Sequence, residues 1–129
     1  MIESESNKSI DLSIKELVKS ARTAQKKYEL FNQDKVDAIV RDIGKFVYDN
    51  AEPLAKMAVD ETEMGSFEDK ILKNKSKARV IWNNLKDKKS RGVIGEDSES
   101  NLVYVAKPMG VVAAVTPVTN PIVTPMCNG

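Results

Sequence analysis

The stretch GVVAAVTPV, residues 110–118, is a run of small and β-branched residues without the apolar–polar alternation of a half-exposed strand. A run of this kind is typical of a strand buried on both faces, as in a parallel sheet. Such a strand needs neighbours on both edges and a covering layer on each face. The sequence offers no parallel partner for it. We therefore expect residues 110–129 to begin an α/β domain whose remaining strands lie outside this chain.

The residues before this stretch predict a helical region. Residues 1–9 are polar and are predicted to be an unstructured lead-in, whereas residues 10–90 carry apolar side chains at the spacing of four amphipathic helices. Asn32 suits the cap of the second helix, Gly65 suits the end of the third, and Ser66 and Asp69 are expected to begin the fourth. The expected buried positions are Ile10, Ile14, Leu17, Val18, Ala21, Tyr28, Val36, Ile39, Val40, Ile43, Phe46, Val47, Leu54, Met57, Ala58, Phe67, Ile71, Ala78, Ile81, Trp82 and Leu85.

The spacing of apolar residues changes from helix-like to strand-like within residues 91–109. Residues 92–95 predict a short strand, the segment EDSES predicts a turn, and residues 101–107 alternate as in a second strand. Pro108 is expected to end it. The predicted fold class is therefore α/β, with N-terminal helices, a β-hairpin and the first strand of an incomplete domain.

The composition excludes several classes of protein. Twenty basic residues against nineteen acidic ones leave a net charge of +1, too little to attract nucleic acid or a membrane surface. Cys127 is the only cysteine and there is no histidine, so an internal disulfide and a cysteine-based metal site are excluded, and no metal is expected. The polar N-terminus is unlike a signal peptide, and we expect the cytoplasm.

The segment TPVTNPIVTPMCNG, residues 116–129, is the one with chemical promise, because ligands bind where strands end in open α/β sheets. It holds no acid or base. The amide of Asn120 suits either of two roles: stabilising negative charge on a carbonyl oxygen, or capping the following helix. Cys127 has the chemistry of a nucleophile, but a small buried residue is favoured because no histidine activates it.

Two stretches, AVDETEMGSFEDKILKN (58–74) and RGVIGEDSESNLVYVAKPMGVVAAVTPVTNP (91–121), resemble the N-terminal part of CoA-acylating aldehyde dehydrogenases. The ending PVTNPIVTPMCN is similar to the branch that includes sulfoacetaldehyde dehydrogenases. The resemblance extends over nearly the whole chain after residue 10. It implies an oxidoreductase that converts an aldehyde to an acyl-CoA with NAD or NADP, using coenzyme A as co-substrate.

The resemblance also implies a domain organisation and a set of site residues. Residues 91–109 fall on the family's oligomerisation hairpin, so a homo-oligomer is expected, and residues 110–129 fall on the start of its Rossmann-like cofactor domain. Asn120 falls on the oxyanion-hole asparagine. The family's nucleophilic cysteine lies downstream, so Cys127 is not that residue and this chain alone is expected to be inactive. The implied cofactor-binding residues are Thr116, Pro117, Val118, Thr119, Asn120, Pro121 and Thr124. The alternative is a non-enzymatic helical interaction module completed by a partner chain.

Overall fold

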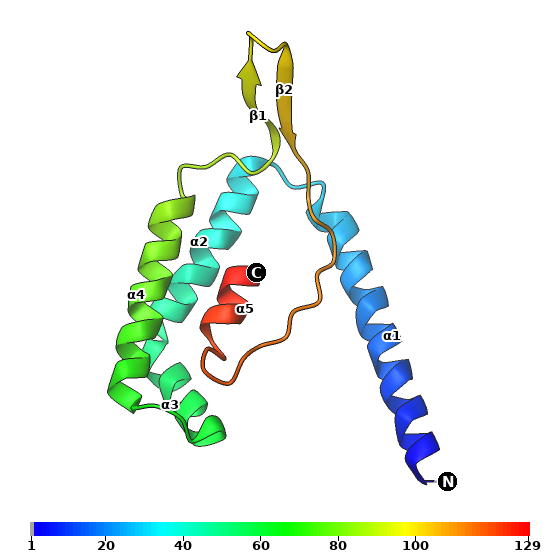
Figure 1. Ribbon diagram of the computed structural model, residues 1–129, viewed down its shortest axis with the longest axis vertical. Coiled ribbons are helices and arrows are strands. Elements are labelled where there is room, and N and C mark those ends of the chain that lie inside the picture. The colour runs from blue at the N-terminus through cyan, green and yellow to red at the C-terminus, as the bar shows by residue number, and fades with distance from the viewer. Residues whose placement is uncertain (1) are drawn as a thin grey trace.

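The computed structural model describes the backbone of residues 2–129 and the side chains of residues 11–129. Figure 1 shows α2, α3, α4 and α5 gathered into one bundle, while α1 and the hairpin of β1 and β2 project from it. None of the described helices has both the length and the apolar character that a membrane crossing requires. The elements are α1 (Ile2–Tyr28), α2 (Gln33–Asp49), α3 (Ala51–Thr62), α4 (Phe67–Leu85), β1 (Gly92–Asp97), β2 (Leu102–Ala106) and α5 (Val123–Asn128).

The first helix departs from the sequence prediction at both its start and its packing. α1 begins at Ile2, so the unstructured lead-in predicted for residues 1–9 is wrong for residues 2–9, and Met1 lies outside the described residues. Within the described chain, α1 packs against no other helix or strand. Leu17, predicted to be buried, is 70% exposed. The apolar face exists, but nothing in the described chain covers it.

Local capping chemistry sets the start of two bundle helices. The side chain of Asn32 accepts a hydrogen bond from the backbone N–H of Lys35 at 3.0 Å, and Ser66 accepts from Asp69 at 3.1 Å. These bonds satisfy N–H groups that a helix start leaves without partners, and they confirm the predicted cap at Asn32 and the predicted helix start at Ser66. α3 ends at Thr62, before Gly65, because Glu63 itself takes the left-handed conformation with φ 51°.

Small side chains bring α3 and α4 close together. Ala51 and Ala55, one turn apart on α3, have no exposed surface. Asn74 of α4 is buried beside them and its side chain donates to the carbonyl oxygen of Ala51 at 3.3 Å. Because buried amides need partners, this bond fixes the register of the two helices. The larger side chains Phe46 and Met57, predicted to be buried, are exposed instead.

The predicted hairpin is confirmed. β1 and β2 pair antiparallel, with Gly92 opposite Ala106 and Asp97 opposite Leu102, and Ile94 is the extra residue of a β-bulge. In the turn, the hydroxyl and the backbone N–H of Ser100 lower the pKa of Asp97 below its ordinary value, because both stabilise the carboxylate.

The buried strand predicted for residues 110–118 is not observed. These residues form no regular secondary structure, and the side chains of Val112 and Val115 are 64% and 95% exposed. A parallel strand exists only where neighbouring strands bind its backbone. The sheet found in the described chain contains β1 and β2 alone, and neither pairs with this segment. The chain is therefore mostly helical with one hairpin.

Arg91 joins three parts of the chain. Its guanidinium donates to the carbonyl oxygens of Tyr28, at 3.2 Å, Glu29 and Phe31, where α1 ends. The side chain of Gln33, at the start of α2, accepts from the backbone N–H of Arg91 at 3.1 Å. The last carbonyls of a helix lack intrahelical partners, and a cation there is favourable. Arg91 therefore holds the end of α1 beside the residue that leads into the hairpin.

We predict that Arg91→Met frees the end of α1 while leaving the bundle folded. Loss of these charge-assisted bonds costs about 1–2 kcal/mol locally, so amide exchange in the last turn of α1 and at the start of β1 should rise roughly five- to thirtyfold. Hydrogen exchange followed by mass spectrometry measures this. The control is Arg41→Met, which removes an exposed ion pair with Asp42. Equal exchange in the two variants would rule out the role given to Arg91.

Substitutions of two glycines by alanine are predicted to change the free energy of unfolding in opposite directions. A Cβ at Gly44, inside α2, would lie 4.0 Å from its nearest neighbour, the carbonyl oxygen of Ala78, so Gly44→Ala should raise the free energy of unfolding by about 0.5–1 kcal/mol. Gly92 has open space around it but a φ of +66°, so Gly92→Ala should lower stability by about 1 kcal/mol. Urea unfolding followed by circular dichroism distinguishes them, and changes of the same sign would contradict this account.

Candidate functional site

The loop that contains the candidate residues is organised by two backbone hydrogen bonds around Asn120. The backbone N–H of Asn120 donates to the carbonyl oxygen of Pro117 at 3.1 Å, which closes a turn. The carbonyl oxygen of Asn120 accepts from the N–H of Thr124 at 3.3 Å, where α5 begins. In Figure 1 the loop descends from the hairpin and turns back to the bundle at this point. Asn120 therefore lies at the turn between the extended segment and α5.

A side chain of the bundle binds the same turn. The ammonium of Lys73, on α4, donates to the carbonyl oxygen of Thr119 at 3.0 Å. Lys73 is half-buried, and the next residue, Asn74, is the buried amide that binds α3. The turn is thereby tied to the part of α4 that is held most firmly against α3.

The side chain of Asn120 does not cap the following helix. Its amide nitrogen donates to the hydroxyl of Thr119 at 3.3 Å, while the N-cap position of α5 is occupied by Ile122 and has no side-chain capping bond. Of the two roles that the sequence left open, helix capping is thus not observed. The amide lies half-buried at the turn, held by one long hydrogen bond.

The structure brings only part of the predicted cofactor-binding set together. Thr119, Asn120 and Pro121 line a small hollow between the loop and the faces of α3 and α4. Thr124 is half-buried on α5. The other three predicted residues are exposed and do not line the hollow, although Pro117 and Val118 belong to the same turn as Asn120: Thr116, Pro117 and Val118.

The residues of α4 that line one side of this hollow were not predicted from the sequence. Lys70, Lys73 and Asn74 line it together with the loop. Their spacing of three and four residues places them on one helix face, which is the signal in the sequence that points to them. What the sequence lacks is any indication that the loop, some 46 residues later, would meet that face.

In α5 the side chain that faces the bundle is that of Met126, not that of Cys127. Met126 is buried against Val47 and Ala78, whereas Cys127 is exposed. A difference of one residue on a helix changes the direction of a side chain by about 100°, so only one of the two faces the bundle. The expectation that Cys127 is buried is wrong. Trp82, on α4, is half-buried and lines a hollow together with residues of α2 and α5.

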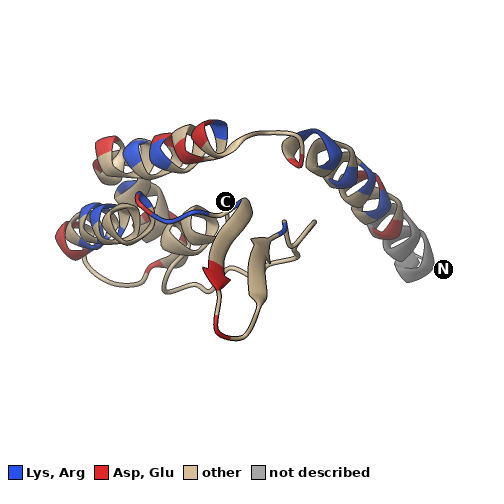
Figure 2. Cartoon of the chain, turned by 90° about the horizontal axis from the view of Figure 1, so that it is seen from above, with Lys and Arg blue, Asp and Glu red and all other residues tan. Residues whose placement is uncertain are grey.

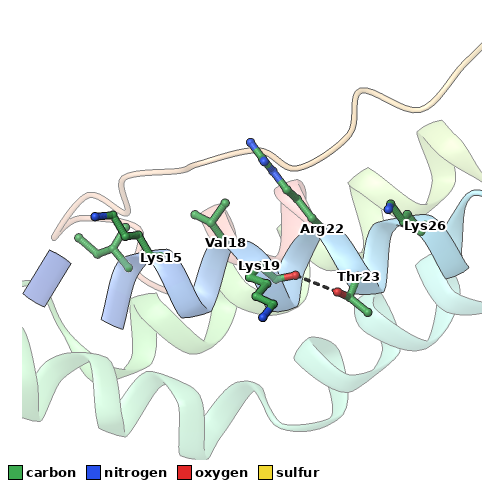
Figure 3. A pocket seen from close by; sticks show the side chains of 7 residues that line it. Lys15, Val18, Lys19, Arg22, Thr23 and Lys26 are labelled. Carbon is green, nitrogen blue, oxygen red and sulfur yellow. Dashed lines mark hydrogen bonds between the residues drawn. The ribbon is translucent and has the colours of Figure 1, made fainter. Parts of the chain in front are cut away.

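The described side chains of α1 form an open hollow rather than an enclosed pocket. Lys15, Val18, Lys19 and Arg22 line a shallow hollow whose walls all come from this one helix, as Figure 3 shows. Thr23 donates back to the carbonyl oxygen of Lys19 at 2.9 Å, a bond within the helix. Figure 2 shows the positions of basic and acidic residues interspersed along the coloured parts of the helices. Among the described side chains, no group of three metal-ligating residues is assembled.

The comparisons with known proteins agree with the resemblance seen in the sequence. The sequence pattern of the aldehyde dehydrogenase family matches residues 5–128. Succinate-semialdehyde dehydrogenase (acetylating) of Clostridium kluyveri is 60% identical over 118 residues, which are 92% of this chain and 26% of that protein. Sulfoacetaldehyde dehydrogenase of an Acholeplasma species is 43% identical over 114 residues, 87% of this chain and 24% of that protein.

The fold also agrees with that of a solved member of this family. An acetylating aldehyde dehydrogenase from Geobacillus thermoglucosidasius superposes with a TM-score of 0.83 and 36% identity, over 89% of this chain and 26% of that one. The chain spans about a quarter of the length of the relatives it matches. It belongs to the aldehyde dehydrogenase family and corresponds to the N-terminal portion of an acylating member.

Proposed function

We propose that this chain provides the first part of a CoA-acylating aldehyde dehydrogenase. In that reaction an aldehyde, NAD or NADP, and coenzyme A give an acyl-CoA, the reduced nicotinamide and a proton. The observation that carries the proposal is the 60% identity to an acetylating dehydrogenase over 92% of the chain. Because the chain spans about a quarter of that relative, the complete reaction belongs to the whole protein.

Asn120 is proposed to bind the oxygen of the reacting aldehyde. When a thiolate adds to the carbonyl carbon, negative charge develops on that oxygen, and a fixed amide donor stabilises it. The amide nitrogen of Asn120 now donates to the hydroxyl of Thr119 at 3.3 Å, beyond the usual range for such a bond. Exchanging this long bond for one to an oxyanion costs little, which suits an amide that must bind a transient charge.

The loop residues suit a part of the cofactor that carries no negative charge. Thr116 and Thr119 present hydroxyl groups, and Pro117 and Val118 present apolar surface, all of them exposed. The segment carries no charge, so it matches a nicotinamide or ribose group better than a phosphate. Bound there, the nicotinamide supplies the hydride acceptor. The role of the loop is to orient that group beside Asn120.

We predict that the isolated chain is inactive, and that it supports activity when it replaces the matching part of a complete relative. In a chimera, this chain replaces the matching residues of the Clostridium kluyveri relative, which is 60% identical to it. With succinate semialdehyde, coenzyme A and NAD or NADP supplied, reduction of the cofactor, followed at 340 nm as an absorbance increase, should occur with the chimera and not with the isolated chain. The chimera's size and thermal midpoint are measured first, so that misassembly is recognised.

Asn120→Ala in the chimera should lower kcat by about 10²–10³, the loss seen when one oxyanion donor is removed. The matched control is Asn128→Ala, an exposed asparagine at the end of α5 that should leave kcat unchanged. An interaction module with no part in catalysis predicts instead a correctly assembled chimera in which both substitutions are silent. Turnover by the isolated chain would contradict the proposal that the reaction requires the whole protein.

A further inference from the structure

We propose that Lys73 is a positioning residue that sets the orientation of Asn120. The inference rests on the proposed role of Asn120 as the oxyanion donor. It concerns the peptide group between Thr119 and Asn120, whose nitrogen is bonded to the Cα that carries the Asn120 side chain. Lys73 reaches this peptide group from α4, across the hollow that the two residues line together.

That peptide group is held on both sides. Its carbonyl oxygen, from Thr119, accepts the hydrogen bond of the Lys73 ammonium at 3.0 Å, and its N–H, from Asn120, donates to Pro117 at 3.1 Å. A peptide group is planar, so two bonds on opposite sides fix its rotation. The direction of the Asn120 side chain follows from that rotation. Removing one of the two bonds leaves the plane free to turn.

The Lys73 bond is the one that ties the turn to α4. The other bonds of the turn, to Pro117 and to Thr124, run between residues of the loop itself or lead into α5. Pro117 and Pro121 have no N–H and so cannot anchor the turn with donors of their own. The Lys73 bond spans 46 residues of sequence and carries a charge, which makes it roughly twice as strong as a neutral bond.

The position of Lys73 is itself well fixed. The adjacent Asn74 is buried and binds the carbonyl oxygen of Ala51, and Ala78, one turn later, is buried in the core. α4 is therefore a rigid support at this point, and Lys73 transfers that rigidity to the loop. A support of this kind is what an oxyanion donor needs, because it must be oriented before charge develops.

The test uses the active chimera and a double-mutant cycle. Lys73→Met removes the donor while keeping the length of the side chain, and should lower kcat about tenfold, as expected for one lost charge-assisted bond, with KM for the nicotinamide cofactor unchanged. Lys73→Arg keeps a charged donor and should recover most of kcat. Lys77→Met, an exposed lysine one turn away on the same helix, is the control and should have no effect.

The decisive measurement is the effect of Lys73→Met in the Asn120→Ala background. A residue that acts through Asn120 has nothing left to position there, so the double variant should be no slower than Asn120→Ala alone. A residue needed only for folding would slow both backgrounds equally. Lys73→Gln, which is neutral but still polar at this half-exposed position, repeats the cycle if Lys73→Met lowers the thermal midpoint.

The outcomes separate the two proposals. If Asn120→Ala leaves kcat unchanged in an active chimera, the proposed role of Asn120 fails, and the inference about Lys73 fails with it. If Asn120→Ala is slow but Lys73→Met is as fast as the unsubstituted chimera, or slows the Asn120→Ala variant further, only the inference about Lys73 is overturned. The expected result is that Lys73→Met lowers kcat in the unsubstituted chimera but not in the Asn120→Ala variant, and that Lys73→Arg recovers most of kcat.

Discussion

Close contact between α3 and α4 is the constraint on which the rest of the structure depends. Ala51 and Ala55 have no exposed surface, and this lets the backbone of α4 approach near enough for Asn74 to bind a main-chain carbonyl. A larger side chain at either alanine would separate the helices and leave the Asn74 amide buried without a partner, a cost of about 1–3 kcal/mol. The same contact sets the direction of Lys73, the neighbour of Asn74, toward the loop.

The candidate site follows from this arrangement rather than from the end of a strand. Asn120 lies in a turn whose backbone is bound by its own loop, by α5 and by α4, and the bond from Lys73 connects it to the helical contact. The stretch just before the turn has no regular structure. Order at Asn120 therefore comes from the bundle, which explains how an otherwise exposed loop holds one amide in a defined place.

The sequence predicted what local chemistry determines. The caps at Asn32 and Ser66 depend on residues three positions away, and the hairpin depends on alternation and a polar turn. It did not predict contacts between distant segments, such as the bond from Lys73 to Thr119, because no local pattern encodes them. Burial at Met126 rather than Cys127 depends on the phase in which α5 meets the bundle, which is also a tertiary property.

The buried strand predicted for residues 110–118 is absent from the structure, although the residue types in this segment are typical of such a strand. Val112 and Val115 have the size and branching of interior strand residues, yet they are exposed. Burial of a parallel strand is a property of a whole sheet, since its edges and faces are covered by other segments. This chain spans about a quarter of the relatives that it matches, and among its described residues no strand pairs with this segment.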